Sequence, residues 1–209
     1  MPQDARNPDR NPGSERNVAG ADPDSDLVRR MQSGDPRGLE ALIRKYQDGI
    51  HALVLRMVDD AGAAEELAQD TFLRAWRNID RFRGESRVST WLYRIAVNLC
   101  RDHHGSRRVR DRLSETSLAE SERTSRLPAS PRPGPDARLE EQEVADHFRQ
   151  ALEGLEPAYR EAFLLRHQQG LAPGEIAEAL GISPGNAKVR VHRAREMILE
   201  TLRRLGHDV

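Results

Sequence analysis

The sequence predicts an all-α protein built from two small helical domains that a flexible linker joins. Apolar residues recur at helical spacing on both sides of a proline-rich stretch, and strand-like alternation appears nowhere in the 209 residues. Hydrophobic residues make up 37% of the chain and charged residues 32%, a balance that favours modest helical cores over one large sheet enzyme. The net charge is −1, so partners must be inferred from where charges cluster.

The chain begins with a polar segment, residues 1–25, that we expect to be a disordered tail. It is rich in Pro, Asn, Asp and Gly and lacks the apolar core of a secretory signal. No apolar run approaches the ~20 residues of a membrane helix. The single cysteine, Cys100, excludes a disulfide within the chain. We therefore expect a cytoplasmic protein with no membrane insertion of its own.

The first domain, residues 26–108, is predicted to contain three or four helices. Its clearest apolar stripe comprises Leu39, Leu42, Ile43, Tyr46, Ile50, Leu53, Val54 and Met57. Gly84 and its polar neighbours interrupt the helical pattern and predict a loop. Ser89 or Thr90 is the expected cap of the helix that follows, whose buried side includes Trp91, Leu92 and Ile95.

A linker is predicted over residues 109–136. Four prolines fall between residues 128 and 135, and apolar periodicity is almost absent. Helical periodicity returns afterwards and defines a second domain over residues 137–205.

The second domain contains the pattern of a helix-turn-helix. A short helix over Pro173–Leu180 is predicted to end at Gly181, and Ser183 is predicted to cap a second helix that begins at Pro184. The second helix has no acidic residue before Arg195 and carries a basic cluster. In a helix-turn-helix this helix lies in the DNA major groove, so the cluster predicts DNA binding.

The first domain divides into an acidic part and a basic part. Its acidic helix has no basic side chain between Met57 and Leu73 and exposes Glu65, Glu66, Gln69 and Asp70. Phosphates repel such a surface, so it fits a protein partner better than DNA. The segment after the loop is basic and includes Arg87, Arg94, Arg101, Arg107, Arg108, Arg110 and Arg112. This division fits a protein that lies between another protein and DNA.

A resemblance to a known family rests on two stretches that cover most of both domains. These are EELAQDTFLRAWRNIDRFRGESRVSTWLYRIAVNLCRD and YREAFLLRHQQGLAPGEIAEALGISPGNAKVRVHRARE. They resemble regions 2 and 4 of bacterial extracytoplasmic-function (ECF) sigma factors of the sigma-70 family, and the envelope-stress type in particular. The resemblance implies a non-enzymatic protein without a cofactor that binds core RNA polymerase and promoter DNA and is restrained by an anti-sigma factor.

The resemblance also implies roles for individual residues. The polymerase clamp would be bound by the residues at the family's polymerase-binding positions, which in this chain are Glu66, Gln69 and Asp70. The minus-ten element would be read by Phe82, Arg83, Gly84, Glu85, Ser86, Arg87, Arg94, Asn98 and Arg101, with Phe82 and Asn98 forming the pocket for a flipped base. The minus-thirty-five element would be contacted by Lys188, Val189, Arg190, His192 and Arg193.

Two other readings of the sequence lead to different functions. Cys100, His103 and His104 could share a helical face as zinc ligands, but a structural zinc site usually has four ligands, and no second Cys/His pair sits at ligand spacing. A helix-turn-helix regulator that does not act as a sigma factor is the alternative function. Phosphate-loop, HExxH and GxSxG motifs are absent, so the sequence indicates no hydrolytic chemistry.

Overall fold

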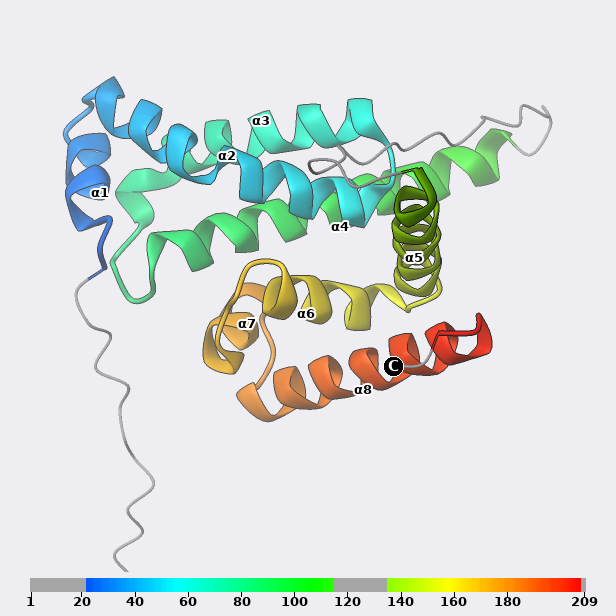
Figure 1. Cartoon of the computed structure of the whole chain (residues 1–209). Coiled ribbons are helices and arrows are strands. Elements are labelled where there is room, and N and C mark those ends of the chain that lie inside the picture. The colour runs from blue at the N-terminus through cyan, green and yellow to red at the C-terminus, as the bar shows by residue number, and fades with distance from the viewer. Residues whose placement is uncertain (1–21, 115–134, 208–209) are drawn as a thin grey trace, which may run out of the picture.

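The computed structural model describes residues 22–114 and 135–207 (Figure 1). Most of the predicted tail and most of the predicted linker therefore lie outside the described residues. Within the described ranges the chain forms eight α-helices and one 3-10 turn, and it contains no strand. The predicted all-α class is confirmed for this part of the chain.

The first lobe, residues 22–114, is a helical bundle in which three long helices pack on one another. Its elements are α1 (Ser25–Gln32), α2 (Pro36–Val58), α3 (Ala61–Asn78), η1 (Ile79–Arg81) and α4 (Val88–Ser114). Helices α2, α3 and α4 are in mutual contact, and α1 packs across α2 (Figure 1). The prediction of three or four helices in this domain is confirmed.

The bend between α2 and α3 is encoded locally. Helix α2 ends at Asp59, which adopts a left-handed conformation with φ of 53°, and the next residue, Asp60, accepts a hydrogen bond from the Ala63 N–H at 2.9 Å. An Asp at this position satisfies a backbone donor that the helix itself cannot pair. Two consecutive aspartates thus end one helix and begin the next, so that α2 and α3 lie against each other.

The second lobe, residues 135–207, contains α5 (Pro135–Glu153), α6 (Pro157–His167), α7 (Pro173–Leu180) and α8 (Pro184–Arg204). Helix α8 contacts the other three helices, and α6 also contacts α7. The core of this lobe includes the fully buried Leu165, Ile176, Ala187 and Ala194.

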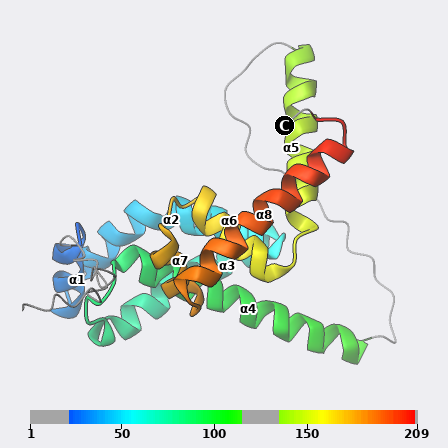
Figure 2. The ribbon, with the colours of Figure 1, turned by 90° about the horizontal axis from the view of Figure 1, so that it is seen from below.

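The two lobes pack on each other in the described arrangement. Helix α7 lies against α4, and α6 lies against α2 (Figures 1 and 2). Helix α4 therefore has one face in the core of the first lobe and another face toward the second lobe. Among the described helices, none combines the length and the apolar character needed to cross a bilayer.

The start of α4 differs from the sequence prediction. The helix begins at Val88, so neither Ser89 nor Thr90 caps it, and the first N–H donates to the carboxylate of Asp22 at 2.7 Å. The cap comes from a residue far away in the sequence, which no local pattern reveals. At its other end α4 continues through Ser114, past residue 108 where the sequence pattern ended the first domain.

Two leucines of the first lobe allow a matched test of the core. Leu53 is fully buried, whereas Leu73 is 46% exposed. We expect Leu53→Ala to lower the free energy of unfolding by about 2–5 kcal/mol, because it leaves a cavity. Leu73→Ala should change it by no more than about 0.5 kcal/mol. Urea denaturation followed by circular dichroism measures both, and equal losses would contradict the assignment of this core.

Candidate nucleic-acid and partner interfaces

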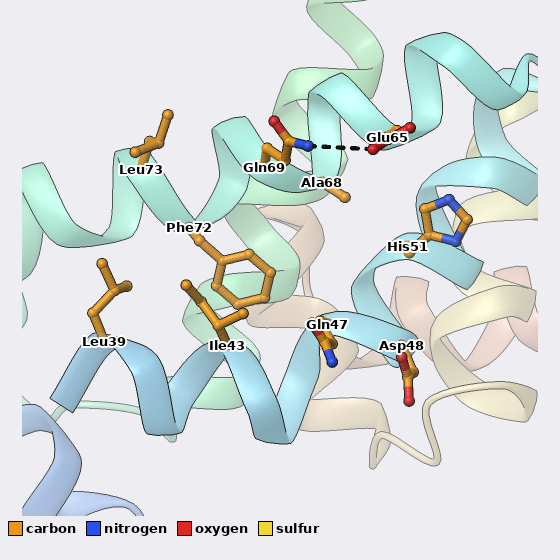
Figure 3. Close-up of a pocket in the computed structure, with 10 residues that line it drawn as sticks. All are labelled: Leu39, Ile43, Gln47, Asp48, His51, Glu65, Ala68, Gln69, Phe72 and Leu73. Carbon is orange, nitrogen blue, oxygen red and sulfur yellow. Dashed lines mark hydrogen bonds between the residues drawn. The ribbon is translucent and has the colours of Figure 1, made fainter. Parts of the chain in front are cut away.

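An apolar groove of about 480 Å³ lies between α2 and α3 (Figure 3). Its lining residues are Leu39, Ile43, Gln47, Asp48, His51, Glu65, Ala68, Gln69, Phe72 and Leu73. Phe72 and Ile43 point toward each other across it, and Leu73 lies at one end with 46% exposure. An apolar floor with a polar rim is typical of a surface that binds another protein.

The predicted polymerase-binding residues lie on α3 beside this groove. Gln69 lines the groove, and its side-chain amide is 3.5 Å from the Glu65 carboxylate. Glu66 and Asp70 are exposed on the same helix but are not lining residues. The exposed side of α3 thus combines an apolar strip with carboxylates, as the sequence pattern indicated. Leu39 and Ile43 of α2 also line the groove, which their place in the apolar stripe of the sequence does not reveal.

A second pocket, of about 350 Å³, surrounds the loop of residues 83–88. Its lining residues are Arg81, Phe82, Arg83, Glu85, Ser86, Trp91, Arg94 and, from the second lobe, Glu178. The rings of Phe82 and Trp91 lie 5.1 Å apart, and Phe82 is only 8% exposed. Arginines around an aromatic pair provide groups that bind phosphates and stack on bases.

The structure brings most, but not all, of the predicted minus-ten residues to this pocket. Phe82, Arg83, Glu85, Ser86 and Arg94 line it. Gly84 lies at the tip of the loop with φ of +71°, a left-handed conformation that favours glycine. Asn98 is exposed on α4 one turn beyond Arg94 and is not among the lining residues.

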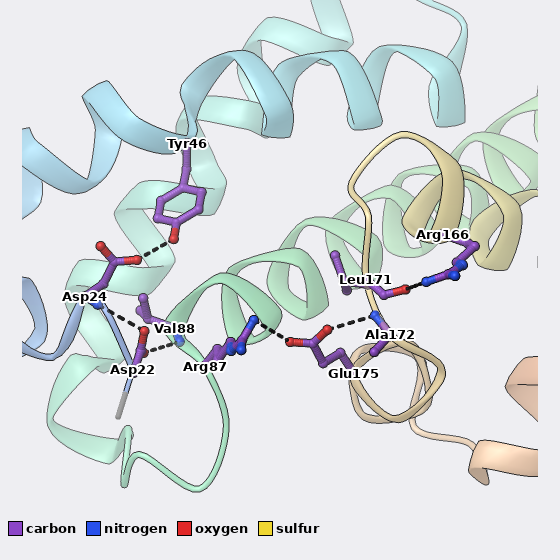
Figure 4. A network of polar contacts seen from close by, with 9 residues as sticks. All are labelled: Asp22, Asp24, Tyr46, Arg87, Val88, Arg166, Leu171, Ala172 and Glu175. Atoms are coloured by element: carbon purple, nitrogen blue, oxygen red, sulfur yellow. Dashed lines mark hydrogen bonds and ion pairs between the residues drawn. The ribbon is translucent and has the colours of Figure 1, made fainter. Parts of the chain in front are cut away.

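A polar network that local sequence patterns do not reveal holds the loop in place (Figure 4). Asp22 caps α4 directly after the loop, and the Gln32 side-chain amide donates to the Phe82 carbonyl oxygen at 3.0 Å directly before it. Asp24, which is 3% exposed, accepts from Lys45 at 2.6 Å and from the Tyr46 hydroxyl. Burial and the neighbouring Asp24 carboxylate raise the pKa of Tyr46, so its hydroxyl stays a donor.

Two predicted DNA-contacting arginines are engaged by the second lobe. Arg101 donates twice to the buried Glu161 of α6, at 2.9 Å and 2.6 Å. The hydrogen bonds to Glu161 raise the pKa of Arg101. Arg87 lies 3.4 Å from Glu175 of α7 (Figure 4). Arg94 remains exposed between them.

The helix-turn-helix has the predicted boundaries. Helix α7 spans Pro173–Leu180, and Gly181 ends it in a left-handed conformation with φ of 69°. The Ser183 hydroxyl accepts a hydrogen bond from the Asn186 N–H at 3.2 Å and so caps α8. The prediction of this motif is confirmed.

The outer face of α8 presents the residues that the sequence assigned to the minus-thirty-five element. Lys188, Val189, His192 and Arg193 are exposed, and Val189 is 49% exposed. Arg190 is half-buried and donates to Asn186 at 3.0 Å, which holds its guanidinium along the helix. His192 lies 3.2 Å from Glu196 one turn later. Exposed basic groups on a second helix of this kind can reach phosphates and base edges together.

The cysteine and the two histidines in the middle of α4 are not gathered into one cluster of ligands. Cys100 is fully buried, and burial raises the pKa of its thiol to about 12, which disfavours the thiolate that binds metals. His104 lies 3.0 Å from the Met57 carbonyl oxygen. Within the described residues, no three Cys, His, Asp or Glu side chains come together to hold an ion.

Two glycines, Gly174 in α7 and Gly181 directly after it, allow a matched test of the turn geometry. Gly181→Ala should lower the free energy of unfolding by about 1 kcal/mol, because a Cβ strains the left-handed conformation. Gly174, inside α7, has nothing within 4 Å of an added Cβ. Gly174→Ala should therefore raise stability by about 0.5–1 kcal/mol. Thermal unfolding measures the two shifts, and shifts of the same sign would contradict this turn.

Sequence models of two families match the chain. Sigma-70 region 2 matches residues 42–110, in the first lobe, and sigma-70 region 4 matches residues 146–198, in the second. The RNA polymerase sigma-H factor of Pseudomonas aeruginosa is 34% identical over 183 residues, which cover 87% of this chain and 95% of that protein. The ECF RNA polymerase sigma factor SigW of Bacillus subtilis is 32% identical over 180 residues, 85% and 96% of the two chains.

Two solved structures have the same two-lobed fold. CnrH in complex with the cytosolic domain of CnrY has a TM-score of 0.62 and 25% identity, with 86% of this chain and 96% of that chain covered. The sigma factor RpoE in complex with the anti-sigma factor NepR from Bartonella quintana also has a TM-score of 0.62 and 25% identity, with 78% and 96% covered.

Proposed function

The chain belongs to the ECF group of the sigma-70 family of RNA polymerase sigma factors, and from this premise we propose how its residues divide the work of transcription initiation. The first lobe binds core polymerase through the α2–α3 groove and captures minus-ten DNA at the 83–88 loop. The second lobe binds the minus-thirty-five element through α8. The observation that carries this division is the separation of an apolar and acidic surface on α3 from basic surfaces on α4 and α8.

Core polymerase would bind the exposed side of α3. The groove offers apolar area from Phe72, Ile43 and Leu73, and Glu66 and Asp70 flank it with negative charge. Apolar contact supplies affinity, while the carboxylates select a basic partner surface and increase the rate of encounter. Gln69, at the edge of the groove, can pair with the partner's backbone or side chains.

Minus-ten DNA would be captured as an unpaired strand. Trp91, backed by the nearly buried Phe82, offers an aromatic face on which a base can stack, worth about 1–3 kcal/mol per base. Arg83 and Arg94 lie at the rim of the same pocket, where they can bind the adjoining phosphates. Asn98, exposed on the same helix, can read the polar edge of the base. Strand separation then needs no covalent chemistry, since binding of the single strand drives melting.

The protein would act without catalysis or cofactor, in the cytoplasm where polymerase transcribes. The solved relatives CnrH and RpoE are each in complex with another polypeptide, an anti-sigma factor in the case of RpoE. We extend this to the present chain and propose that an anti-sigma factor restrains it by covering its polymerase- or DNA-binding surfaces.

Transcription with purified core polymerase tests the function and the acidic surface together. The chain added to core enzyme alone should direct run-off transcription from a promoter, whereas a helix-turn-helix regulator would need a holoenzyme already present. Glu66→Lys with Asp70→Lys should lower core affinity by about tenfold, since each reversed charge faces a basic partner. Asp26→Lys, at an exposed pair on α1, reverses one charge and is the matched control for each single substitution, Glu66→Lys or Asp70→Lys; it should leave core affinity unchanged.

The salt dependence of binding tests the minus-thirty-five surface. Duplex DNA selected by the chain from a random library should bind Lys188→Ala and Arg193→Ala more weakly. Each substitution should lower the slope of log affinity against log salt by about one, because one phosphate contact is lost. Arg204→Ala, at the far end of the same helix, is the control and should leave the slope unchanged. Equal slopes for all variants in fluorescence anisotropy would refute the assignment of α8.

A further inference from the structure

The polar contacts between the lobes involve the same face of the first lobe to which minus-ten binding is assigned. Arg101 is held by Glu161, and Arg87 by Glu175. Between them, Tyr93 of α4 donates to the Gln169 side chain at 2.7 Å, and Gln169 in turn donates to the Gly49 carbonyl oxygen at 3.0 Å. These contacts place the turn before α7 directly over α2 and α4.

Helix α7 brings two carboxylates to the arginines around the 83–88 loop. Glu175 and Glu178 lie one turn apart on α7; Glu175 reaches Arg87, and Glu178 lines the pocket with Arg81, Arg83 and Arg94 (Figure 4 shows the first of these contacts). Carboxylates and phosphates are both anions that accept hydrogen bonds from guanidinium groups. The two acidic residues of α7 therefore stand where DNA phosphates would bind.

The other DNA-binding face is free in the same arrangement. Lys188, Val189, His192 and Arg193 of α8 are exposed, and none of them takes part in the polar contacts between the lobes described above. In this closed arrangement, in which the lobes pack on each other, the minus-ten surface is covered and the minus-thirty-five surface is exposed.

We propose that the described closed arrangement is autoinhibitory: the second lobe masks the minus-ten surface of the first lobe with Glu161, Glu175 and Glu178 and leaves the minus-thirty-five face available. The inference rests on the proposed function of the 83–88 loop. A single DNA strand competes with α7 for the same arginines. Core polymerase or DNA that binds only the open arrangement shifts the population toward it.

The contacts that hold the second lobe over the minus-ten surface can break and re-form. Glu161 is 4% exposed, and its burial comes in part from the lobe contact that includes Arg101. When the lobes separate, both charged groups regain water, which offsets most of the attraction that is lost. The pair between Arg87 and Glu175 is partly exposed, with side-chain exposures of 53% and 27%, so solvent already screens it.

Gly49 offers a way to open the lobes from a position outside the proposed binding surfaces. A Cβ at Gly49 would lie 3.1 Å from Oε1 of Gln169 and 3.4 Å from the Tyr93 hydroxyl. Gly49→Leu should therefore expel Gln169 from its place on α2. Gly105→Leu is the matched control, since this helical glycine of α4 has nothing within 4 Å of an added Cβ. Glu161→Ala combined with Glu178→Arg opens the lobes by a different route, through charge.

The experiment combines a distance measurement with two DNA probes on the full chain. Dyes on cysteines introduced at the exposed Glu40 and Glu200 report the separation of the lobes by single-molecule energy transfer, and the buried Cys100 stays unlabelled. Fluorescence anisotropy measures binding of a single-stranded oligonucleotide that carries the selected minus-ten sequence. It also measures binding of a duplex that carries the minus-thirty-five sequence.

We expect the wild-type chain and Gly105→Leu to show high energy transfer and weak binding of the single strand. Gly49→Leu and the charge variant should show low transfer and bind the single strand about tenfold more tightly, because the competent population rises. Duplex affinity should stay within about twofold in all four proteins.

Three results would overturn the proposal in different ways. Low transfer in the wild-type chain would show that the closed arrangement is not populated. Opened variants that bind the single strand no better than wild type would show that α7 masks nothing. If no variant bound the single strand although the lobes had opened, the proposed minus-ten site itself would be refuted. The autoinhibition proposed from it would then be refuted as well.

Discussion

The arrangement of the two lobes depends on the ion pair between Arg101 of the first lobe and Glu161 of the second. Glu161 is a carboxylate that is almost wholly buried at the surface between the lobes, and a buried charge is tolerated only when it is paired and hydrogen-bonded. Arg101 meets this requirement with two hydrogen bonds from a helix of the other lobe. Because α6 is thereby held against the first lobe, α7 comes to lie on α4, and its carboxylates reach the loop before that helix.

Helix α4 is the element that connects packing to function. One side of it, with Leu92, Ala96 and Val97, is fully buried in the first lobe. Arg94, Asn98 and Arg101 recur at helical spacing on another side, so they form a single stripe. A stripe of this kind can hold either a DNA strand or the second lobe at a given moment. The competition follows from the geometry of one helix and needs no separate inhibitory segment.

Features encoded by neighbouring residues could be predicted from the sequence, and features that join distant residues could not. The turn between α7 and α8 follows from Gly181 and Ser183, and its boundaries agree with the structure. Local patterns predict Ser89 or Thr90 as the cap of α4, because they cannot reveal that Asp22 reaches Val88. The contacts of Gln169 and Glu161 were missed for the same reason. The role of Asn98 stays a prediction, since the pocket of the 83–88 loop does not include it.

The connection between the lobes is long enough to permit both a closed and an open arrangement, so the contacts between the lobes decide which one prevails. The 20 residues from 115 to 134 can span roughly 70 Å when extended, so they do not force α7 onto α4. Because both lobes belong to one chain, weak contacts between them re-form more readily than contacts between separate molecules. The half-buried pair of Arg101 with Glu161, the solvent-screened pair of Arg87 with Glu175 and the hydrogen bonds of Gln169 are then enough to favour closure. Ligands with even modest preference for the open form can reverse that balance, because the free-energy difference between the forms is correspondingly small.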